Sequence, residues 1–459
     1  MTMDFGRRVF LAAIILSLTG AAQAARTEPL YLTGGTVISM VAGQRPFPAT
    51  VLIDDGRINA ISPAMHPPAR ARVIDISGRY LFPGFIDMHA HVTFLPTGML
   101  GSYDRGTSEQ VLKMMLAYGI TTVRNPAAPA AEGVKLRDDV ADGRIAGPRI
   151  LTAGEPLNGK PLVTEAQIRA EVDRQANAGV DYIKVYANST PLQTAAAIDE
   201  AHKRGLKVIG HLQETDWPTA AAQGIDAVTH GVSWSASALP PDKRDAYRAE
   251  QKRVGAMKAR IFWLESVDVG GPEIGKVVAS LKQHHVSDDP TLIVYKTKFV
   301  PAEEYRSQEN LGLAPLTMRE SWRGGGFTAD WTPADYARMA KAWPKMLQLI
   351  YRYYREGVLL TAGTDLPNQF VVPGKSLHQE MELLVQAGIP AEEVLAMSTR
   401  NAATVLGLAG DIGTVEAGKR ADLVVLRKNP LADIRNSSQI DLVVVKGQLL
   451  KPAALLGGR

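Results

Sequence analysis

A short apolar run leads into two histidines in the segment Pro83-Gly84-Phe85-Ile86-Asp87-Met88-His89-Ala90-His91. The apolar run after Pro-Gly is typical of a short buried strand. Because side chains alternate between the two faces of a strand, His89 and His91 point the same way. Two imidazoles on one face at the carboxyl end of a strand can chelate one divalent cation. Histidine pairs in this spacing are common by chance, but the Pro-Gly and the apolar strand before this pair favour a metal site.

Short apolar runs alternate with helical patterns through the middle of the chain, as in a parallel array of strands and helices. A long helix is expected at Pro333–Glu356, and Ile261–Leu264 competes with one of the strands for the seventh place. Eight strands are expected, the number that a TIM barrel needs. They lie at Phe85–His91, Thr121–Asn125, Arg149–Ala153, Tyr182–Tyr186, Lys207–His211, Ala227–His230, Pro290–Tyr295 and Val358–Asp365.

Both ends of the chain have a different sequence pattern, in which short runs of β-branched residues lie between turn residues. Thr50-Val51-Leu52-Ile53 is one such run near the start, and Leu442-Val443-Val444-Val445 is one near the end. The sequence therefore predicts an α/β protein, a (β/α)8 TIM barrel with a small β-sandwich domain formed from both chain ends. The barrel is expected over residues 81–407 and the composite β domain over residues 27–80 plus 408–455.

Two further histidines close expected strands. His211 follows Val208-Ile209-Gly210, and His230 follows Ala227-Val228-Thr229. Either one alone is more readily explained as a core histidine with a hydrogen-bond partner. Together with His89 and His91, however, they make four imidazoles at the barrel mouth, where the active sites of TIM barrels lie. This coincidence favours a metal centre.

Asp365 and Lys184 complete the set of candidate ligands. Asp365 ends the apolar strand that begins at Val358, so its carboxylate is expected at the same mouth, although aspartate also favours helix N-caps. Strand alternation places Ile183 and Val185 on one face and Lys184 on the other. A lone ammonium inside the barrel would be costly. Reaction with carbon dioxide would turn the amine into a carbamate whose two oxygens can bridge two metals; a lysine paired with a carboxylate is the alternative.

At this point the chain resembles the amidohydrolase superfamily over almost its whole length. The histidine pair, the lysine of strand four, the histidines of strands five and six and the aspartate of strand eight match in order. Gly179-Val180-Asp181-Tyr182-Ile183-Lys184-Val185 is similar to the carboxylated-lysine strand of the imidazolonepropionase-like and Xaa-Pro or Xaa-Arg dipeptidase-type branch. Residues 376–380, 399–403 and 413–424 resemble that branch's last helices and its return to the β domain.

This resemblance implies a metal-dependent hydrolase that cleaves an amide bond, peptide-like or in an N-acyl amino acid. It implies that His89, His91 and Asp365 hold one metal, that His211 and His230 hold the other, and that Lys184, as N6-carboxylysine, bridges them. Zinc is the default cation for these ligands, and manganese, cobalt and iron also bind such sites. A metal-bridging hydroxide would attack the carbonyl carbon, and Asp365 would carry the proton to the leaving amine.

Other functions stay open at this point. A mononuclear deaminase of the same superfamily is one, because His211-Leu212-Gln213-Glu214 places a glutamate shortly past a ligand. Lactone or phosphotriester hydrolysis needs the same metal pair, since fold does not fix the substrate. A non-catalytic binding protein on the same barrel would be marked by a lost ligand, and every ligand position is filled. Three residues are expected near a small-molecule substrate: Tyr186, Tyr295 and His378.

Composition limits the cofactor and the partners. The chain of 459 residues has no cysteine, which excludes disulfides and thiolate ligands. Its charge of +4 comes from scattered residues, so no nucleic-acid partner is expected.

Residues 1–24 read as a signal peptide that ends in Ala22-Gln23-Ala24, with Arg7-Arg8 suggesting twin-arginine export. An exported, periplasmic or secreted enzyme is therefore expected, without stable membrane insertion after cleavage; association into a homo-oligomer stays open.

Overall fold

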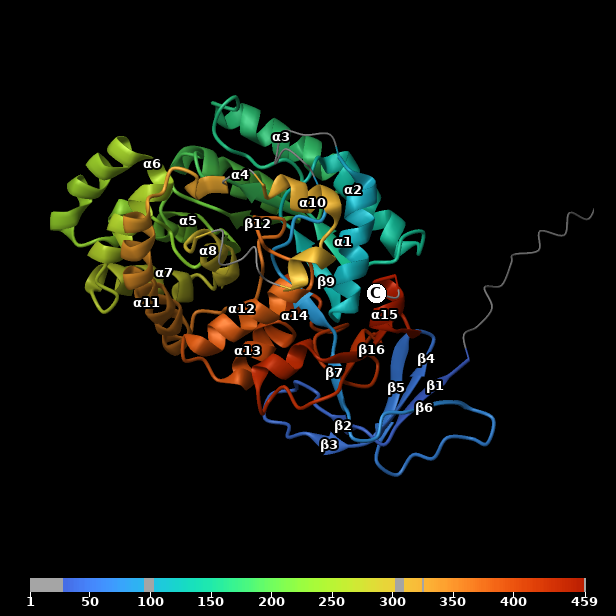
Figure 1. Cartoon of the computed structure of the whole chain (residues 1–459). Coiled ribbons are helices and arrows are strands. Elements are labelled where there is room, and N and C mark those ends of the chain that lie inside the picture. Colours follow the sequence, from blue (N-terminus) through green and yellow to red (C-terminus); the bar gives the residue numbers. More distant parts are fainter. Residues whose placement is uncertain (1–27, 95–102, 302–308, 324–325, 458–459) are drawn as a thin grey trace, which may run out of the picture.

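The computed structural model describes residues 28–94, 103–301, 309–323 and 326–457 (Figure 1). The signal peptide expected at residues 1–24 lies outside the described residues and stays a prediction. Among the helices that are described, none combines the length and apolar character that crossing a membrane requires.

The centre of the molecule is the expected barrel of parallel strands. Two runs of hydrogen-bonded neighbours form most of it, in the orders β10-β9-β8 and β11-β12-β13-β14. Isolated parallel bridges join Ala153 to Tyr182 and Asp288 to Leu360, and a third joins Ala90 to Leu366. The eighth place is thus taken by residues 358–366, which carry bridges instead of a regular strand. The strands are β8 (Phe85–Asp87), β9 (Ile120–Asn125), β10 (Arg149–Thr152), β11 (Tyr182–Val185), β12 (Lys207–Gly210), β13 (Ala227–Thr229) and β14 (Ser287–Asp289).

The expected seventh strand at Pro290–Tyr295 is wrong. The strand at that place is β14 (Ser287–Asp289), and the apolar run after it forms helix α8 (Leu292–Lys298). The competing segment Ile261–Leu264 lies in helix α6. The strand was predicted from the hydrophobic pattern, and this pattern missed β14 because its three residues are polar, although all of them are buried. The first strand also ends earlier than expected, at Asp87, so His89 and His91 lie just past it.

Helices surround the barrel (Figure 1). The longest, α11, occupies the expected residues, because Thr332 and Asp335 form a capping box at its start and Gly357 ends it in a left-handed conformation. The α-helices are α1 (Arg105–Ala117), α2 (Ala130–Ala141), α3 (Glu165–Ala178), α4 (Pro191–Lys203), α5 (Trp217–Ala222), α6 (Arg244–Ser266), α7 (Pro272–Gln283), α8, α10 (Leu316–Ser321), α11 (Pro333–Glu356), α12 (Lys375–Gln386), α13 (Ala391–Met397), α14 (Arg400–Leu406) and α15 (Pro452–Leu455). Short 3-10 helices are η2 (Ala236–Ala238), η3 (Pro241–Lys243), η4 (Glu309–Leu313), η5 (Gly326–Thr328) and η6 (Ile434–Ser438).

Residues from both ends of the chain share a second, smaller core in two sheets. The sheet orders are β5-β4-β1-β6 and β17-β16-β15-β7-β2-β3. In the second sheet the late strand β15 pairs with the early strand β7. Leu32, Val51, Leu81, Val425 and Val444 are buried together between them. The strands are β1 (Leu30–Thr33), β2 (Thr36–Val37), β3 (Phe47–Pro48), β4 (Thr50–Asp54), β5 (Arg57–Ser62), β6 (Arg72–Asp75), β7 (Tyr80–Pro83), β15 (Leu423–Leu426), β16 (Ile440–Val445) and β17 (Gln448–Leu450).

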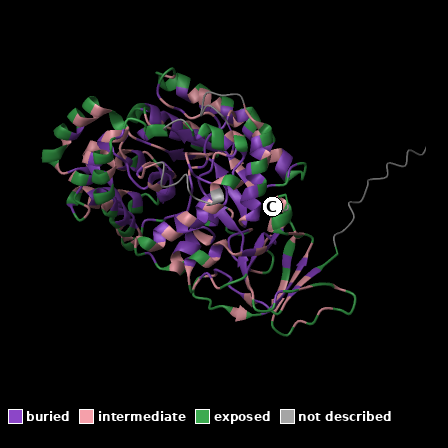
Figure 2. Ribbon diagram, viewed as in Figure 1, coloured by how far each residue is buried: buried purple, intermediate pink, exposed green. Residues whose placement is uncertain are grey.

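The junction between β7 and β8 positions the first histidines. Gly84 separates the two strands, and a Cβ there would lie 2.1 Å from the Thr121 hydroxyl oxygen, so a larger residue does not fit. Phe85 and Ile86 are fully buried, as are most residues of the barrel strands (Figure 2). The chain therefore leaves β8 anchored on both sides, with His89 and His91 held at the barrel mouth.

Candidate active site

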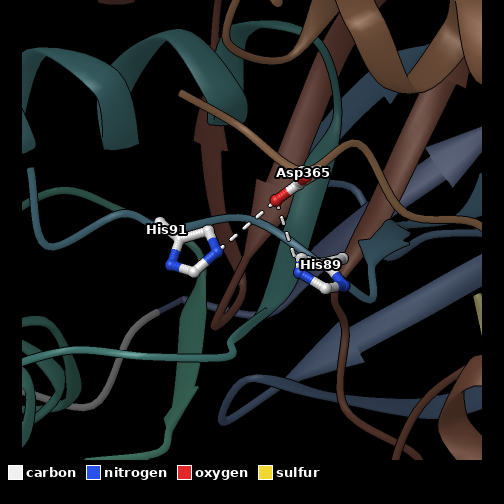
Figure 3. A group of neighbouring side chains, drawn as sticks. All are labelled: His89, His91 and Asp365. Atoms are coloured by element: carbon white, nitrogen blue, oxygen red, sulfur yellow. Dashed lines mark ion pairs between the residues drawn. The ribbon is translucent and has the colours of Figure 1, made fainter. Parts of the chain in front are cut away.

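His89, His91 and Asp365 meet at the barrel mouth (Figure 3). The Nε2 atom of His89 lies 3.4 Å from Oδ1 of Asp365, and Nε2 of His91 lies 3.5 Å from the same oxygen. One potential ligand atom from each of the three residues lies within 4.8 Å of the other two. The two histidines therefore converge as expected, although they lie past the end of the strand, and a single cation could contact all three side chains.

The backbone around Asp365 is unusual. Asp365 has a φ of 56°, a left-handed conformation that is uncommon for residues other than glycine. Its N–H donates to the carbonyl oxygen of His89 at 2.7 Å. Gly363 makes this approach possible, because a Cβ there would lie 2.8 Å from the Cβ of His89. The segment after the eighth barrel position is therefore fixed directly against the first histidine.

His211 and His230 lie beside this group. The ring centroids of His211 and His230 are 4.3 Å apart, and those of His230 and His89 are 4.8 Å apart. His230 also has a left-handed φ, of 79°, and its Nδ1 lies 2.9 Å from the Thr291 hydroxyl. All four expected imidazoles therefore gather in one place. Strained residues of this kind cluster at functional sites.

Lys184 lies inside the same group, on β11. Its side chain is 1% exposed, and its Nζ makes no hydrogen bond within the described part of the chain. Burial lowers the pKa of Lys184 to about 8, although Asp289 acts in the opposite direction. The alternative considered above, a lysine paired directly with a carboxylate, is not what the described residues contain. A buried amine without a partner needs another explanation.

The protonation states suit metal binding. Burial, together with the charge of Lys184, holds the pKa of His89 and of His211 well below the usual value, so these imidazoles are neutral. Burial works against ionisation of Asp365, but the hydrogen bond with His91 and the charges around it lower the pKa of Asp365 to about 2. Neutral imidazole and ionised carboxylate are the forms that ligate divalent cations. The donor set therefore fits a metal centre.

Sequence reasoning missed the group that supports His89. Asp289, at the end of β14, accepts a hydrogen bond from Nδ1 of His89 at 2.6 Å and one from Arg124 at 2.5 Å. Arg124 in turn donates to the carbonyl oxygen of Met88 at 2.8 Å. Such partners fix the tautomer and the orientation of a metal-binding histidine. Burial raises the pKa of Asp289 to about 7, against the effect of Arg124. The sequence did contain a signal for Asp289, because this carboxylate ends a barrel strand. The signal was missed because the seventh strand was predicted at the wrong residues.

A cavity of about 750 Å³ opens above these residues, and it is lined by all six expected ligands. Tyr186 and Tyr295 also line it, as expected. The ring of Tyr186 lies 4.6 Å from that of His211, and the hydroxyl of Tyr295 accepts a hydrogen bond from Trp234 at 3.0 Å. Tyr295 reaches the cavity from helix α8, not from a strand.

His378 is placed elsewhere. It is buried in α12, where Nδ1 lies 2.9 Å from the Ser437 hydroxyl and Nε2 lies 2.9 Å from the carbonyl oxygen of Tyr118. It does not line the cavity, so we leave it out of the site. Glu214, the glutamate that suggested a deaminase, is exposed and does not line the cavity either. Both residues follow their strands in sequence, but the chain turns them away from the mouth.

Relatives with known names match most of the chain. An imidazolonepropionase from Shouchella clausii is 24% identical over 403 residues, which cover 84% of this chain and 80% of that protein. One from Klebsiella pneumoniae is 26% identical over 386 residues, covering 82% and 85%. A 5-methylthioadenosine/S-adenosylhomocysteine deaminase from Symbiobacterium thermophilum is 25% identical over 442 residues, covering 87% and 85%.

Solved structures share the fold. A Xaa-Pro dipeptidase with methionine in its active site aligns with a TM-score of 0.67 at 19% identity, over 92% of this chain and 100% of that one. Bottromycin amidohydrolase aligns with a TM-score of 0.69 at 22% identity, over 94% and 91%. The pattern of the amidohydrolase family matches residues 80–450. The chain therefore belongs to the amidohydrolase family, and it is a hydrolase that acts on carbon–nitrogen bonds.

Proposed function

We propose that this protein is a binuclear metal-dependent hydrolase that cleaves an amide bond in a peptide-like compound or an N-acyl amino acid. One observation carries the proposal: four imidazoles, the Asp365 carboxylate and the unpartnered amine of Lys184 line one cavity. A single cation needs only the three residues of the first group. A second cation would account for the remaining donors.

The chain's own residues divide into two ligand groups. His89, His91 and Asp365 would hold one cation, His211 and His230 the other, and a carboxylated Lys184 would contact both. Two such ions would lower the pKa of a water molecule between them and polarise the substrate carbonyl. Zinc fits the imidazole-rich donor set, and manganese, cobalt and iron are the alternatives that metal content would distinguish.

Lys184 is suited to carboxylation. Its buried amine has a pKa of about 8, so a substantial neutral fraction is present near neutral pH. The nitrogen lone pair attacks carbon dioxide, an N–C bond forms, and the nitrogen loses one proton. The product is an anion in place of a cation. Because Arg124 pairs with the neighbouring Asp289, the negative carbamate meets little opposition there.

Asp365 would transfer the proton from the attacking water to the leaving amine. Its carboxylate is ionised, lies within 3.5 Å of nitrogens of two histidines and borders the cavity. It accepts a proton from the attacking water and donates it to the nitrogen of the leaving amine, so that the carbon–nitrogen bond breaks without a free amide anion. Tyr186 and Tyr295 border the same space and would contact the substrate.

A mononuclear deaminase is the second candidate. The three-residue group His89, His91 and Asp365 could hold a cation alone, and one relative is named a deaminase. The exposed position of Glu214 argues against it, because that glutamate would have to carry protons inside the cavity.

Metal analysis and a substrate panel test the proposal. Purified protein is expected to hold two metal ions per chain and to release the amine from dipeptides or N-acyl amino acids. The panel should also contain aminopurines, lactones and phosphotriesters. One ion per chain with ammonia release would favour the deaminase. Two ions with cleavage confined to lactones or phosphotriesters would overturn the amide assignment.

A further inference from the structure

Two cationic side chains face the cavity, one from helix α6 and one from helix α8. Arg260 of α6 and Lys298 of α8 both line it. Within the residues that the structure describes, neither forms an ion pair, and the one hydrogen bond of the Arg260 guanidinium goes to the sulfur of Met257 at 3.5 Å. By contrast, the buried guanidinium of Arg124 is paired with Asp289. The pair is therefore free to bind an anion from outside the chain.

Aromatic rings hold both cations in place. The guanidinium of Arg260 lies 4.8 Å from the ring centre of Trp234 and 5.7 Å from that of Tyr295. The ammonium of Lys298 lies 4.5 Å from the ring centre of Phe327. Cation–π contacts hold a charge without neutralising it. Arg260 is only 7% exposed, so water screens its charge poorly. Burial also lowers the pKa of Lys298 to about 8, against the attraction of Asp365.

The pair lies close to the reacting centre. The ring of Tyr295, which contacts Arg260, lies 6.4 Å from that of His230. Lys298 is close enough to Asp365 for the two charges to stabilise each other. In the proposed reaction, Asp365 donates its proton to the leaving nitrogen. An anion near Lys298 is then on the amine side of the scissile bond, where an amino acid carries its carboxylate.

We propose that Arg260 and Lys298 form a subsite for the carboxylate of the leaving amino acid, so that the substrates are dipeptides or N-acyl amino acids with a free carboxyl end. This inference rests on the proposed amide hydrolysis, and it narrows the substrates to amides that carry a free carboxylate. Neutral amides lack the anion, and two cations would then stay unpaired in the complex. Buried charges that stay unpaired in a complex cost free energy, so the enzyme should discriminate strongly against neutral amides.

Matched substrates test the subsite. N-acetyl-L-phenylalanine and N-acetylphenethylamine differ only in the carboxylate, and the same comparison can be made with leucine and isopentylamine. For the carboxylate compound, Lys298→Met and Arg260→Met should each lower kcat/KM about 10- to 100-fold, mainly through KM, as expected for a charge-assisted hydrogen bond. For the neutral compound the change should be less than about threefold. Lys298→Arg should restore most of the loss.

Two control variants lie on the same helices. Lys296→Met removes a lysine of α8 that contacts Trp343, and Arg253→Met removes an arginine of α6 that pairs with Glu250; neither lines the cavity. Both should leave the preference unchanged. Equal cleavage of the two compounds by the wild-type enzyme, or equal losses for both in the Lys298 and Arg260 variants, would overturn the subsite while leaving amide hydrolysis intact.

Calorimetry separates this inference from the proposed function. If no amide is cleaved, the reaction assignment fails, but binding of N-acetyl-L-phenylalanine can still be measured. Binding to the wild type that weakens in Lys298→Met, with no binding of N-acetylphenethylamine, would support the subsite. Absence of binding, or equal binding to wild type and variant, would overturn it.

Discussion

The floor and the wall of the cavity are built from different parts of the chain. The floor consists of residues at or just past barrel strands: His89, His91, His211, His230, Lys184 and Asp365. The wall that carries Arg260 and Lys298 belongs to helices α6 and α8. Hydrogen bonds orient floor histidines, as Asp289 orients His89 and Thr291 orients His230. The two cations of the wall, Arg260 and Lys298, instead make cation–π contacts with aromatic rings.

This difference separates reactivity from selectivity. A change in the floor should affect every substrate, because each one needs the same attacking water and the same proton carrier. A change in the wall should affect only substrates that carry the matching charge. The predictions below test that separation.

Asp365→Asn should have the largest effect. An amide can neither accept nor donate the proton, so kcat should fall about 10³- to 10⁴-fold, the upper range for general acid–base catalysis. The loss should be equal for the carboxylate compound and the neutral compound. Steady-state kinetics with both compounds and metal analysis of the variant check this. A loss confined to the carboxylate compound would erase the distinction between floor and wall.

Asp289→Asn should weaken the support of the floor. It removes the anion between His89 and Arg124, and loss of a metal ligand's hydrogen-bond partner costs about 10- to 100-fold in metal affinity. The buried Arg124 then loses its counter-charge, which costs about 3–5 kcal/mol in the free energy of unfolding. Metal titration and urea unfolding at pH 8 measure the two effects. Asp142→Asn, at an exposed ion pair with Arg144, is the control and should change neither.

The smallest effect concerns His378, which belongs to neither region. Burial lowers the pKa of His378 to about 4, below the value of 6.5 for an unfolded chain. Between these values the unfolded chain binds the proton, so stability is lost as the pH falls from 6.5 towards 4. The loss amounts to about 3 kcal/mol in the free energy of unfolding.

His378→Gln removes this contribution, so its stability should depend less on pH than that of the wild type. Urea unfolding between pH 7.5 and 4.5 measures the two slopes. The exposed His66 supplies the matched control, His66→Gln, which should follow the wild type. If the slope of His378→Gln also follows the wild type, His378 does not titrate as the structure implies.

The floor could be predicted from the sequence because strand alternation is a local property. An apolar run followed by an imidazole identified His211 and His230, and alternation placed Lys184 inside the barrel. Asp289 was missed because its strand, Ser287–Asp289, is polar and short. The apolar run Leu292–Tyr295 gave a stronger strand signal but forms a helix.

The wall could not be predicted. Arg260 follows a break in helix α6 at Gly255, where φ is 81°, and Lys298 ends a seven-residue helix. Nothing local in the sequence indicates that these two residues face the same cavity. Their proximity depends on how two inserted segments pack over the barrel, which only the three-dimensional structure contains.

Lys184→Met removes the amine on which the proposed second metal site depends. Methionine keeps an unbranched apolar side chain in the buried space but cannot form a carbamate. Metal content should fall from two ions per chain to one or fewer. In the wild type grown with ¹³C-bicarbonate, a carbamate carbon resonance should appear that the variant lacks. A Lys184→Met protein that keeps two ions and full activity would contradict the account.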